Sequence, residues 1–220
     1  MLEFSKTFQK YKHLVAEIDA VVDKVKGSYP DCVRCELYCS DCCNAVFDLT
    51  LVESVYINYK FYQLIPEEVQ KEILERAEPS DRKFYRIQHN ARKMHIYQSK
   101  SQDEILNFLA EERIRCPFLN ASETCDFYSF RPITCRVYGI PTSFGGSAHI
   151  CGRSDFKEGQ PYPTVNMDSI HQRLLNLSRE MIEETGLEDQ ELHRSLAPVS
   201  TSLLQIYDED FFRKKGSGGD

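Results

Sequence analysis

The sequence predicts a mainly α-helical protein in which helices frame an irregular, cysteine-rich metal-binding core. Three observations support this prediction. Apolar residues recur at helical spacing near both ends of the chain, five cysteines lie within twelve residues, and a later stretch rich in proline, glycine and cysteine interrupts the helices. A chain of 220 residues can bury a substantial core without disulfides, so the cysteines need another explanation.

The first expected helix spans residues 2–26. Its apolar residues step by three and four positions, which places them on one helical face. They are Phe4, Phe8, Tyr11, Val15, Ile18, Val22 and Val25, and Gly27 with Pro30 ends the run. This amphipathic segment, 1–27, either packs on the protein's own core or pairs with a protein partner as a coiled coil. Three heptads are the lower limit of a coiled-coil signal, which favours packing on the core.

Three further helices are expected before the middle of the chain. Thr50 and Glu53 have the spacing of a capping box, which starts a second helix. Pro66, followed directly by two glutamates, starts a third. Ser101 and Glu104 repeat the capping-box spacing and start a fourth, which should end near residue 112.

The pattern changes between residues 115 and 163, where prolines, glycines and cysteines break any helical period. Irregular structure with short strands is expected there. A long helix returns over 167–185, ended by Gly186, and a short helix pair should follow before residue 212. The expected divisions are a cysteine-cluster metal-binding domain at 28–165, a C-terminal helical segment packed on it at 166–212, and a flexible tail at 213–220.

Charge and hydropathy exclude several classes of protein. The net charge of −7 disfavours a nucleic-acid binder, and the basic stretch at 82–100 is expected to be a solvated helix face. No apolar run approaches the roughly 18 residues of a membrane span. The N-terminus lacks the apolar core of a signal peptide. We therefore expect a cytoplasmic protein with no membrane or nucleic-acid partner, whose thiols stay reduced.

The nine cysteines form two groups that favour metal binding over disulfides. The first group is Cys32, Cys35, Cys39, Cys42 and Cys43, and the second is Cys116, Cys125, Cys135 and Cys151. Close pairs such as Cys39 and Cys42 present two sulfurs to one ion, and thiolates select zinc or iron–sulfur clusters. Eight cysteines would fill two tetrahedral sites, or one [4Fe–4S] cluster with thiols left over.

Neighbouring residues add expectations about this core. Cys42 and Cys43 should point in different directions from an extended backbone, so they serve two centres, or one binds metal while the other is buried. Surplus thiolate charge is too costly to bury without compensating groups. The flanking arginines should therefore offset it, Arg131 and Arg136 above all. The other candidates are Arg34, Arg115 and Arg153. His149 is weighed as a mixed zinc ligand, although a supporting or surface role is more common.

The motifs CELYCSDCC (35–43), CPFL (116–119) and CDFYSFRPITCRVYG (125–139), with a later cysteine, form a specific pattern. Over residues of about 32 to 151 the chain resembles the YkgJ-type cysteine-cluster family, a zinc- or iron-chelating domain, and it is distantly similar to flagellin lysine methylase. The resemblance implies that the metal ligands are Cys35, Cys39, Cys42, Cys43, Cys116, Cys125, Cys135 and Cys151. Cys32 does not map cleanly and is an alternative ligand through its C-x2-C spacing to Cys35.

Three functions are compatible with these residues. The first is a protein that binds zinc or an iron–sulfur cluster, [4Fe–4S] if the metal is iron, with a redox or metal-handling role. The second is a cluster-dependent enzyme resembling a protein lysine methylase. The third is a structural zinc module that presents its N-terminal helix to a protein partner. No phosphate loop, hydrolase or metalloprotease motif occurs, so the sequence assigns no catalytic residue.

Overall fold

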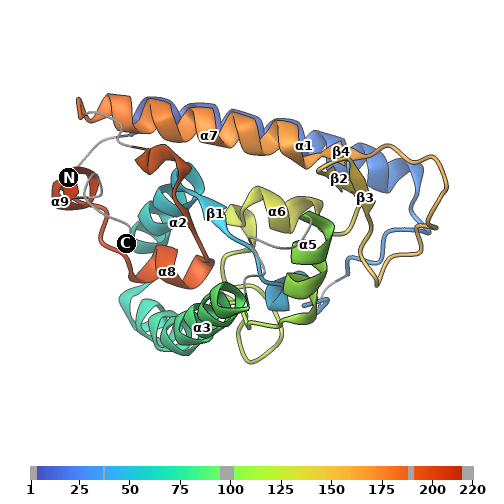
Figure 1. Cartoon of the computed structure of the whole chain (residues 1–220), viewed down its shortest axis with the longest axis horizontal. Helices are drawn as coiled ribbons and strands as arrows, with labels where there is room; N and C mark the ends of the chain where they lie inside the picture. Colours follow the sequence, from blue (N-terminus) through green and yellow to red (C-terminus); the bar gives the residue numbers. More distant parts are fainter. Residues whose placement is uncertain (1–3, 37, 95–101, 188–190, 215–220) are drawn as a thin grey trace.

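The computed structural model describes residues 4–36, 38–94, 102–187 and 191–214 (Figure 1). The fold is mainly α-helical, as the sequence predicts. Its helices are α1 (Ser5–Ser28), α2 (Leu51–Leu64), α3 (Glu67–Lys93), α5 (Gln102–Glu111), α6 (Ile133–Val137), α7 (Met167–Glu184), α8 (Val199–Leu204) and α9 (Glu209–Lys214). The described 3₁₀ turns are η1 (Cys42–Asn44), η2 (Tyr128–Phe130) and η3 (Leu192–Arg194).

Short strands join segments that are far apart in the chain. Strand β1 (Leu49–Thr50) pairs antiparallel with β5 (Leu196–Ala197). Strand β2 (Thr142–Phe144) lies between β3 (Ser147–His149), which is antiparallel to it, and β4 (Val165–Asn166), which is parallel. The second sheet therefore connects β3, which lies just before Cys151, to β4, which directly precedes α7.

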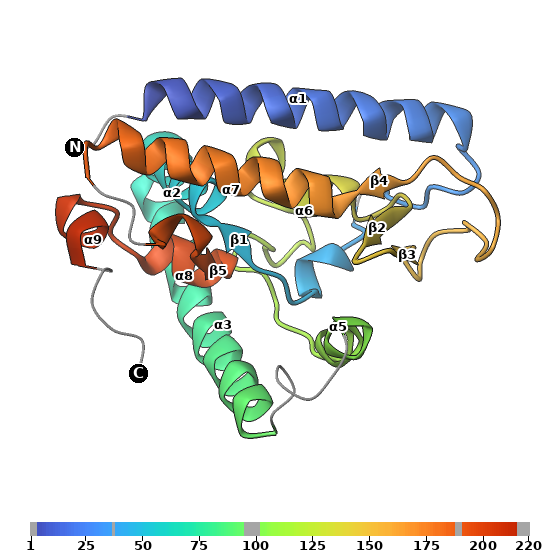
Figure 2. The ribbon, with the colours of Figure 1, turned by 45° about the horizontal axis from the view of Figure 1, so that its top comes forward.

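Helices α1 and α7 lie side by side along one face of the molecule (Figures 1 and 2). They run antiparallel, because the main-chain N–H of Thr7 donates to Glu184 Oε1 at 2.8 Å and Lys10 pairs with Glu180 at 2.6 Å. The buried face of α1 consists of Thr7, Phe8, Tyr11, Leu14, Ile18, Val22 and Val25. This stripe packs on α7, α6 and α2 of the same chain, so the structure does not support its use as a coiled-coil seam for a partner.

Helix boundaries agree closely with the capping signals. Helix α2 follows Thr50 directly, and Pro66 immediately precedes α3. The Thr50 hydroxyl donates to the Glu53 carboxylate at 3.3 Å instead of accepting a main-chain hydrogen bond, so the capping box is only half formed. Helix α5 begins where expected, although Ser101 lies outside the described residues. Helix α1 continues one residue past Gly27 before it ends.

The basic stretch lies on the second half of α3. Arg82, Lys83 and Arg86 are exposed, whereas Phe84 and Ile87 on the opposite face are buried. The prediction of a solvated helix face is confirmed for residues 82–94, and 95–100 lie outside the described residues. None of the described helices combines the length and apolar character needed to cross a bilayer.

Two elements were missed where the sequence predicts only irregular structure. Helix α6 and the turn η1 both lie in cysteine-containing segments. The expected short helix pair near the C-terminus is present as α8 and α9. Helix α9 includes residues 213 and 214, which the sequence prediction assigns to the tail, and the rest of that tail lies outside the described residues.

A second, smaller hydrophobic core packs against the segments that carry Cys116 and Cys125. It contains Leu49, Ile57, Phe61, Ile73, Phe118, Phe127, Val199 and Leu203. The rings of Phe118 and Phe127 stack with centroids 4.5 Å apart. Because each phenylalanine lies two residues after a cysteine, the stacked pair fixes the backbone around Cys116 and Cys125, which pack against this core.

Candidate metal centre

The turn η1 brings the two cysteine groups together. Its 3₁₀-type hydrogen bonds, such as the one from Cys43 N–H to the Ser40 carbonyl at 3.0 Å, fold the first cysteine group into a compact loop. The outward carbonyl of Cys43 accepts from Cys116 N–H at 2.7 Å, and that of Asn44 accepts from Ile114 N–H at 3.0 Å. Two segments seventy residues apart in sequence are thus joined by main-chain hydrogen bonds.

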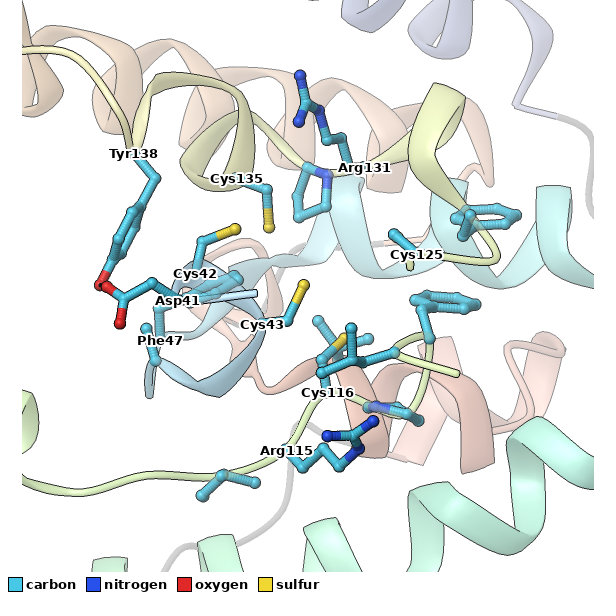
Figure 3. A pocket seen from close by; sticks show the side chains of 18 of the residues that line it. Asp41, Cys42, Cys43, Phe47, Arg115, Cys116, Cys125, Arg131, Cys135 and Tyr138 are labelled. Atoms are coloured by element: carbon cyan, nitrogen blue, oxygen red, sulfur yellow. Dashed lines mark hydrogen bonds between the residues drawn. The ribbon is translucent and has the colours of Figure 1, made fainter. Parts of the chain in front are cut away.

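All eight predicted ligands line one cavity of about 480 Å³: Cys35, Cys39, Cys42, Cys43, Cys116, Cys125, Cys135 and Cys151. Figure 3 shows five of them, Cys42, Cys43, Cys116, Cys125 and Cys135, gathered around it. The ninth cysteine lies elsewhere. Cys32 does not line the cavity and packs against the α1–α7 core, so the structure gives it no place as a replacement ligand.

The eight sulfurs form two neighbouring sets with Cys42 between them. Burial raises the pKa of Cys35, and the adjacent thiols of Cys39 and Cys151, then Cys42, raise it further. Burial raises the pKa of Cys116 to about 12, and the Cys125 and Cys42 thiols contribute. The thiols of Cys43 and Cys135 belong to this second set, since both interact with Cys42 and Cys116.

The pKa of Cys42 is shifted in the opposite direction from that of its neighbours. Hydrogen bonds from Cys135 and then Cys43 lower its pKa to about 3 and correspondingly raise the pKa of both donors. The backbone here is a 3₁₀ turn, not the extended chain assumed from the sequence. The premise of an extended backbone at Cys42 and Cys43 is therefore wrong, and both residues line the same cavity.

Main-chain N–H groups point at three of the sulfurs. The N–H of Arg153 donates to Cys151 Sγ at 3.4 Å. Burial raises the pKa of Cys116 and of Cys125, while the N–H groups of Phe118 and Leu119 lower it for Cys116 and that of Phe127 lowers it for Cys125. Such donors stabilise the ionised sulfur, which is the form that binds metal. The donor set and its surroundings therefore fit a thiolate-bound metal.

Gly139 leaves space for the sulfur of Cys35. A Cβ atom at position 139 would overlap Cys35 Sγ. The glycine that ends the CRVYG motif thus has a steric role that the sequence alone did not reveal. Only a residue without a side chain lets this sulfur occupy its position beside the main chain.

Asp41, which directly precedes Cys42, connects the cysteine segments to one another. Its carboxylate accepts a hydrogen bond from the Tyr138 hydroxyl at 3.1 Å, as Figure 3 shows, and lies 3.7 Å from Arg113 and 3.6 Å from Arg153. Sequence reasoning missed both Asp41 and Tyr138. Their signals were an acidic residue inside the cysteine cluster and a tyrosine three positions after Cys135.

One of the two favoured arginines lies near the thiols. Arg131 lines the cavity and favours the thiolate forms of Cys42 and Cys125, while its guanidinium stacks on the Tyr128 ring at 3.9 Å. The expectation for Arg136 is wrong, because its guanidinium binds Asp19 of α1 at 2.6 and 2.9 Å.

The remaining arginines each pair with a carboxylate, and Arg115 also lines the cavity, as do the carboxylate partners Glu123 and Asp41. Arg34, Arg115 and Arg153 pair with Asp155, Glu123 and Asp41, respectively. His149 does not line the cavity, so the structure does not support it as a ligand.

The thiols as placed do not yet surround an ion. Across the described ranges of the chain, no group of three or more Cys, His, Asp or Glu side chains is arranged so that it could hold a metal. Zinc–sulfur bonds are about 2.3 Å long, so metal binding requires the sulfurs to turn inward about their single bonds. The shared cavity gives them room to do so.

The helical frame and the eight free thiols around one cavity define a cysteine-cluster protein. The CxxCxxCC family model, described as "Putative zinc- or iron-chelating domain", matches residues 32–152, and the chain belongs to this family. The match covers more than half of the chain, which confirms the resemblance inferred from cysteine spacing. Neither the curated proteins nor the solved structures contain a significant match.

Proposed function

We propose that the eight cavity cysteines bind zinc or iron in two adjacent thiolate centres. We further propose that the protein passes this metal to, or accepts it from, other molecules. The observation that carries the proposal is the convergence on one cavity of eight of the nine cysteines, all within the residues that the family model matches. Cys39 belongs with Cys35 and Cys151, whereas Cys43 belongs with the three remaining thiols. Cys42 interacts with both sets and would complete or bridge them.

The chain's own groups would prepare the thiols for metal. Main-chain N–H donors favour the ionised form of three sulfurs, and Arg131 supplies positive charge beside them. Bound zinc would hold the thiolates together without redox change, whereas an iron–sulfur cluster would add electron transfer.

The accessibility of one thiol favours metal handling over a sealed structural site. Cys35 is exposed as a residue although its sulfur is partly shielded beside Gly139, whereas the other cavity cysteines are partly buried as residues. A ligand at the surface can be replaced by an incoming thiol from another molecule. All nine cysteines are free, so no disulfide competes with metal for the cavity thiols.

Anaerobic purification followed by elemental analysis tests the proposal. We expect either two zinc ions per chain or at least as many iron ions per chain. Visible absorbance is expected only if an iron–sulfur cluster is present. A colourless protein with two zinc ions would exclude the cluster. Cys32→Ser should keep the full metal content, whereas Cys135→Ser should lose part of it. A chain that binds neither zinc nor ferrous iron in titrations contradicts the proposal.

The size of the cavity favours a second candidate, a cluster-dependent enzyme. Its volume of about 480 Å³ lies in the range of small-molecule sites, and Phe84 and Val199 contribute apolar side chains to its lining. The similarity to flagellin lysine methylase makes S-adenosylmethionine the compound to test. Calorimetry on the metal-loaded protein should show binding if this candidate is correct, and no heat at high concentration counts against it.

A further inference from the structure

We propose that Glu53 is a positioning residue for Cys135, because its buried carboxylate holds the first turn of the short helix that carries this cysteine. The proposal rests on the metal-binding function argued above. It assigns a role in site assembly to a residue of α2 that does not itself line the cavity.

The Glu53 carboxylate joins three helices. Its side chain is buried, with 3% of the residue exposed. Oε1 accepts from the main-chain N–H of Ile133 at 3.1 Å and from the Tyr11 hydroxyl at 3.4 Å. Oε2 accepts from the Thr50 hydroxyl at 3.3 Å. The carboxylate thus links α1, α2 and the first residue of α6.

Helix α6 depends on such outside support. It has five residues, fewer than an isolated helix needs to be stable in water. Pro132 at its N-cap provides no side-chain hydrogen bond, and the free N–H groups of a helix start need acceptors. Glu53 meets this need from another helix. Ile133 and Val137 are also buried, with 1% and 2% exposed, so apolar packing holds the helix while Glu53 fixes its start.

Cys135 follows Ile133 by two residues in the same turn. Its side chain lines the cavity beside Cys42, as Figure 3 shows. A shift of the α6 start would therefore move a sulfur at the centre of the site. This predicts that loss of the Glu53 carboxylate loosens metal binding more than its effect on overall stability would explain.

The neighbouring residue offers a matched control. Ser54 is equally buried on α2, with 2% exposed, and it accepts a hydrogen bond from Ser202 of α8 at 3.0 Å. It points toward a different helix from Glu53. Ser54→Ala should lower the stability of the fold while leaving α6 in place.

The experiment compares Glu53→Ala, Glu53→Gln and Ser54→Ala with the unaltered chain. In the metal-free protein, amide hydrogen exchange at Ile133 should become faster in Glu53→Ala and stay unchanged in Ser54→Ala. Zinc affinity, measured by competition with a chelator, should fall by about 10- to 100-fold in Glu53→Ala, as for other groups that orient metal ligands. Ser54→Ala should bind zinc like the unaltered chain.

The outcomes separate this proposal from the proposed function. If the unaltered chain binds no zinc or ferrous iron, the metal-binding function fails, while exchange at Ile133 still decides the role of Glu53. If Glu53→Ala does not fold, Glu53→Gln keeps the shape and one acceptor oxygen and should show smaller changes in the same direction. Exchange and affinity that change no more than in Ser54→Ala would overturn the proposal.

Discussion

The Tyr138 hydroxyl donates a hydrogen bond to Asp41 Oδ2 at 3.1 Å and joins the end of α6 to the turn that carries Cys42 (Figure 3). Asp41 is 18% exposed at its side chain, so this bond is partly shielded from water. Tyr138→Phe should lower the free energy of unfolding by about 1 kcal/mol, since the two arginines at longer distance remain. Urea denaturation of the metal-free protein measures this loss. Tyr128→Phe is the control, because this exposed tyrosine keeps its ring over Arg131, and an equal loss there would contradict the prediction.

Gly139→Ala should expel the sulfur of Cys35 from the site. The sulfur lies at the end of a side chain, so it can rotate away while the backbone stays, and the metal-free fold should remain stable. Zinc affinity should fall as far as in Cys35→Ser, and the double variant should bind no more weakly than either single one, because both remove the same contact.

Gly152→Ala is the matched control for this substitution. Position 152 follows Cys151 directly, but an added Cβ there meets no atom within 4 Å. It should bind zinc normally. Normal binding by Gly139→Ala as well would refute the steric role of the glycine.

Asp48→Asn should stabilise the protein at neutral pH. Burial raises the pKa of Asp48 from 3.8 to about 6, and its buried Oδ1 has no hydrogen-bond partner among the described residues. The folded chain therefore holds this proton more tightly than the unfolded chain, and stability declines as pH rises from about 4 to about 6. The variant removes this penalty, which amounts to at most about 3 kcal/mol.

The advantage of Asp48→Asn should be full above pH 7 and absent below pH 4, as thermal or urea unfolding across this range would show. Asp23→Asn on the exposed face of α1 serves as the control. A stability difference that does not depend on pH would rule out ionisation of Asp48 as the cause.

Leu14→Ala should strongly destabilise the fold, because α1 belongs to the core. Leu14 is 1% exposed, and truncating such a side chain costs about 2–5 kcal/mol. Val21→Ala on the outer face, where 42% of the residue is exposed, should change stability by less than about 0.5 kcal/mol. If both variants unfold at the same denaturant concentration, α1 does not pack as described.

Local periodicity and helix-start signals were enough to predict the long helices, and the basic run in an acidic chain predicted the solvated face of α3. The stripe of α1 and the run over 167–185 repeat over several turns, so the pattern is strong without knowledge of their partners. The resemblance to the cysteine-cluster family likewise implied the eight thiols that share the cavity. The helical signal lies within short stretches of sequence, whereas the cysteine pattern combines two groups, 35–43 and 116–151.

The parts that escaped prediction depend on residues far apart in the chain. Helix α6 has one local signal, Pro132 followed by Ile133 and Val137 at helical spacing, but its support comes from Glu53, eighty residues earlier. Arg136 looked like a counterion for thiolates because of its neighbours in sequence, whereas the fold places Asp19 beside it. Spacing along the chain does not reveal such pairs.

The pairing of α1 with α7 affects when the protein can fold during synthesis. The first helix leaves the ribosome about 140 residues before its partner, which takes on the order of 10 s at ordinary rates of elongation. All eight cavity cysteines are made within that interval, before α7 can cover the core. The nascent chain therefore presents a complete set of reduced thiols on an unfinished scaffold, and a cell that loads metal at this stage would do so before the helical frame closes.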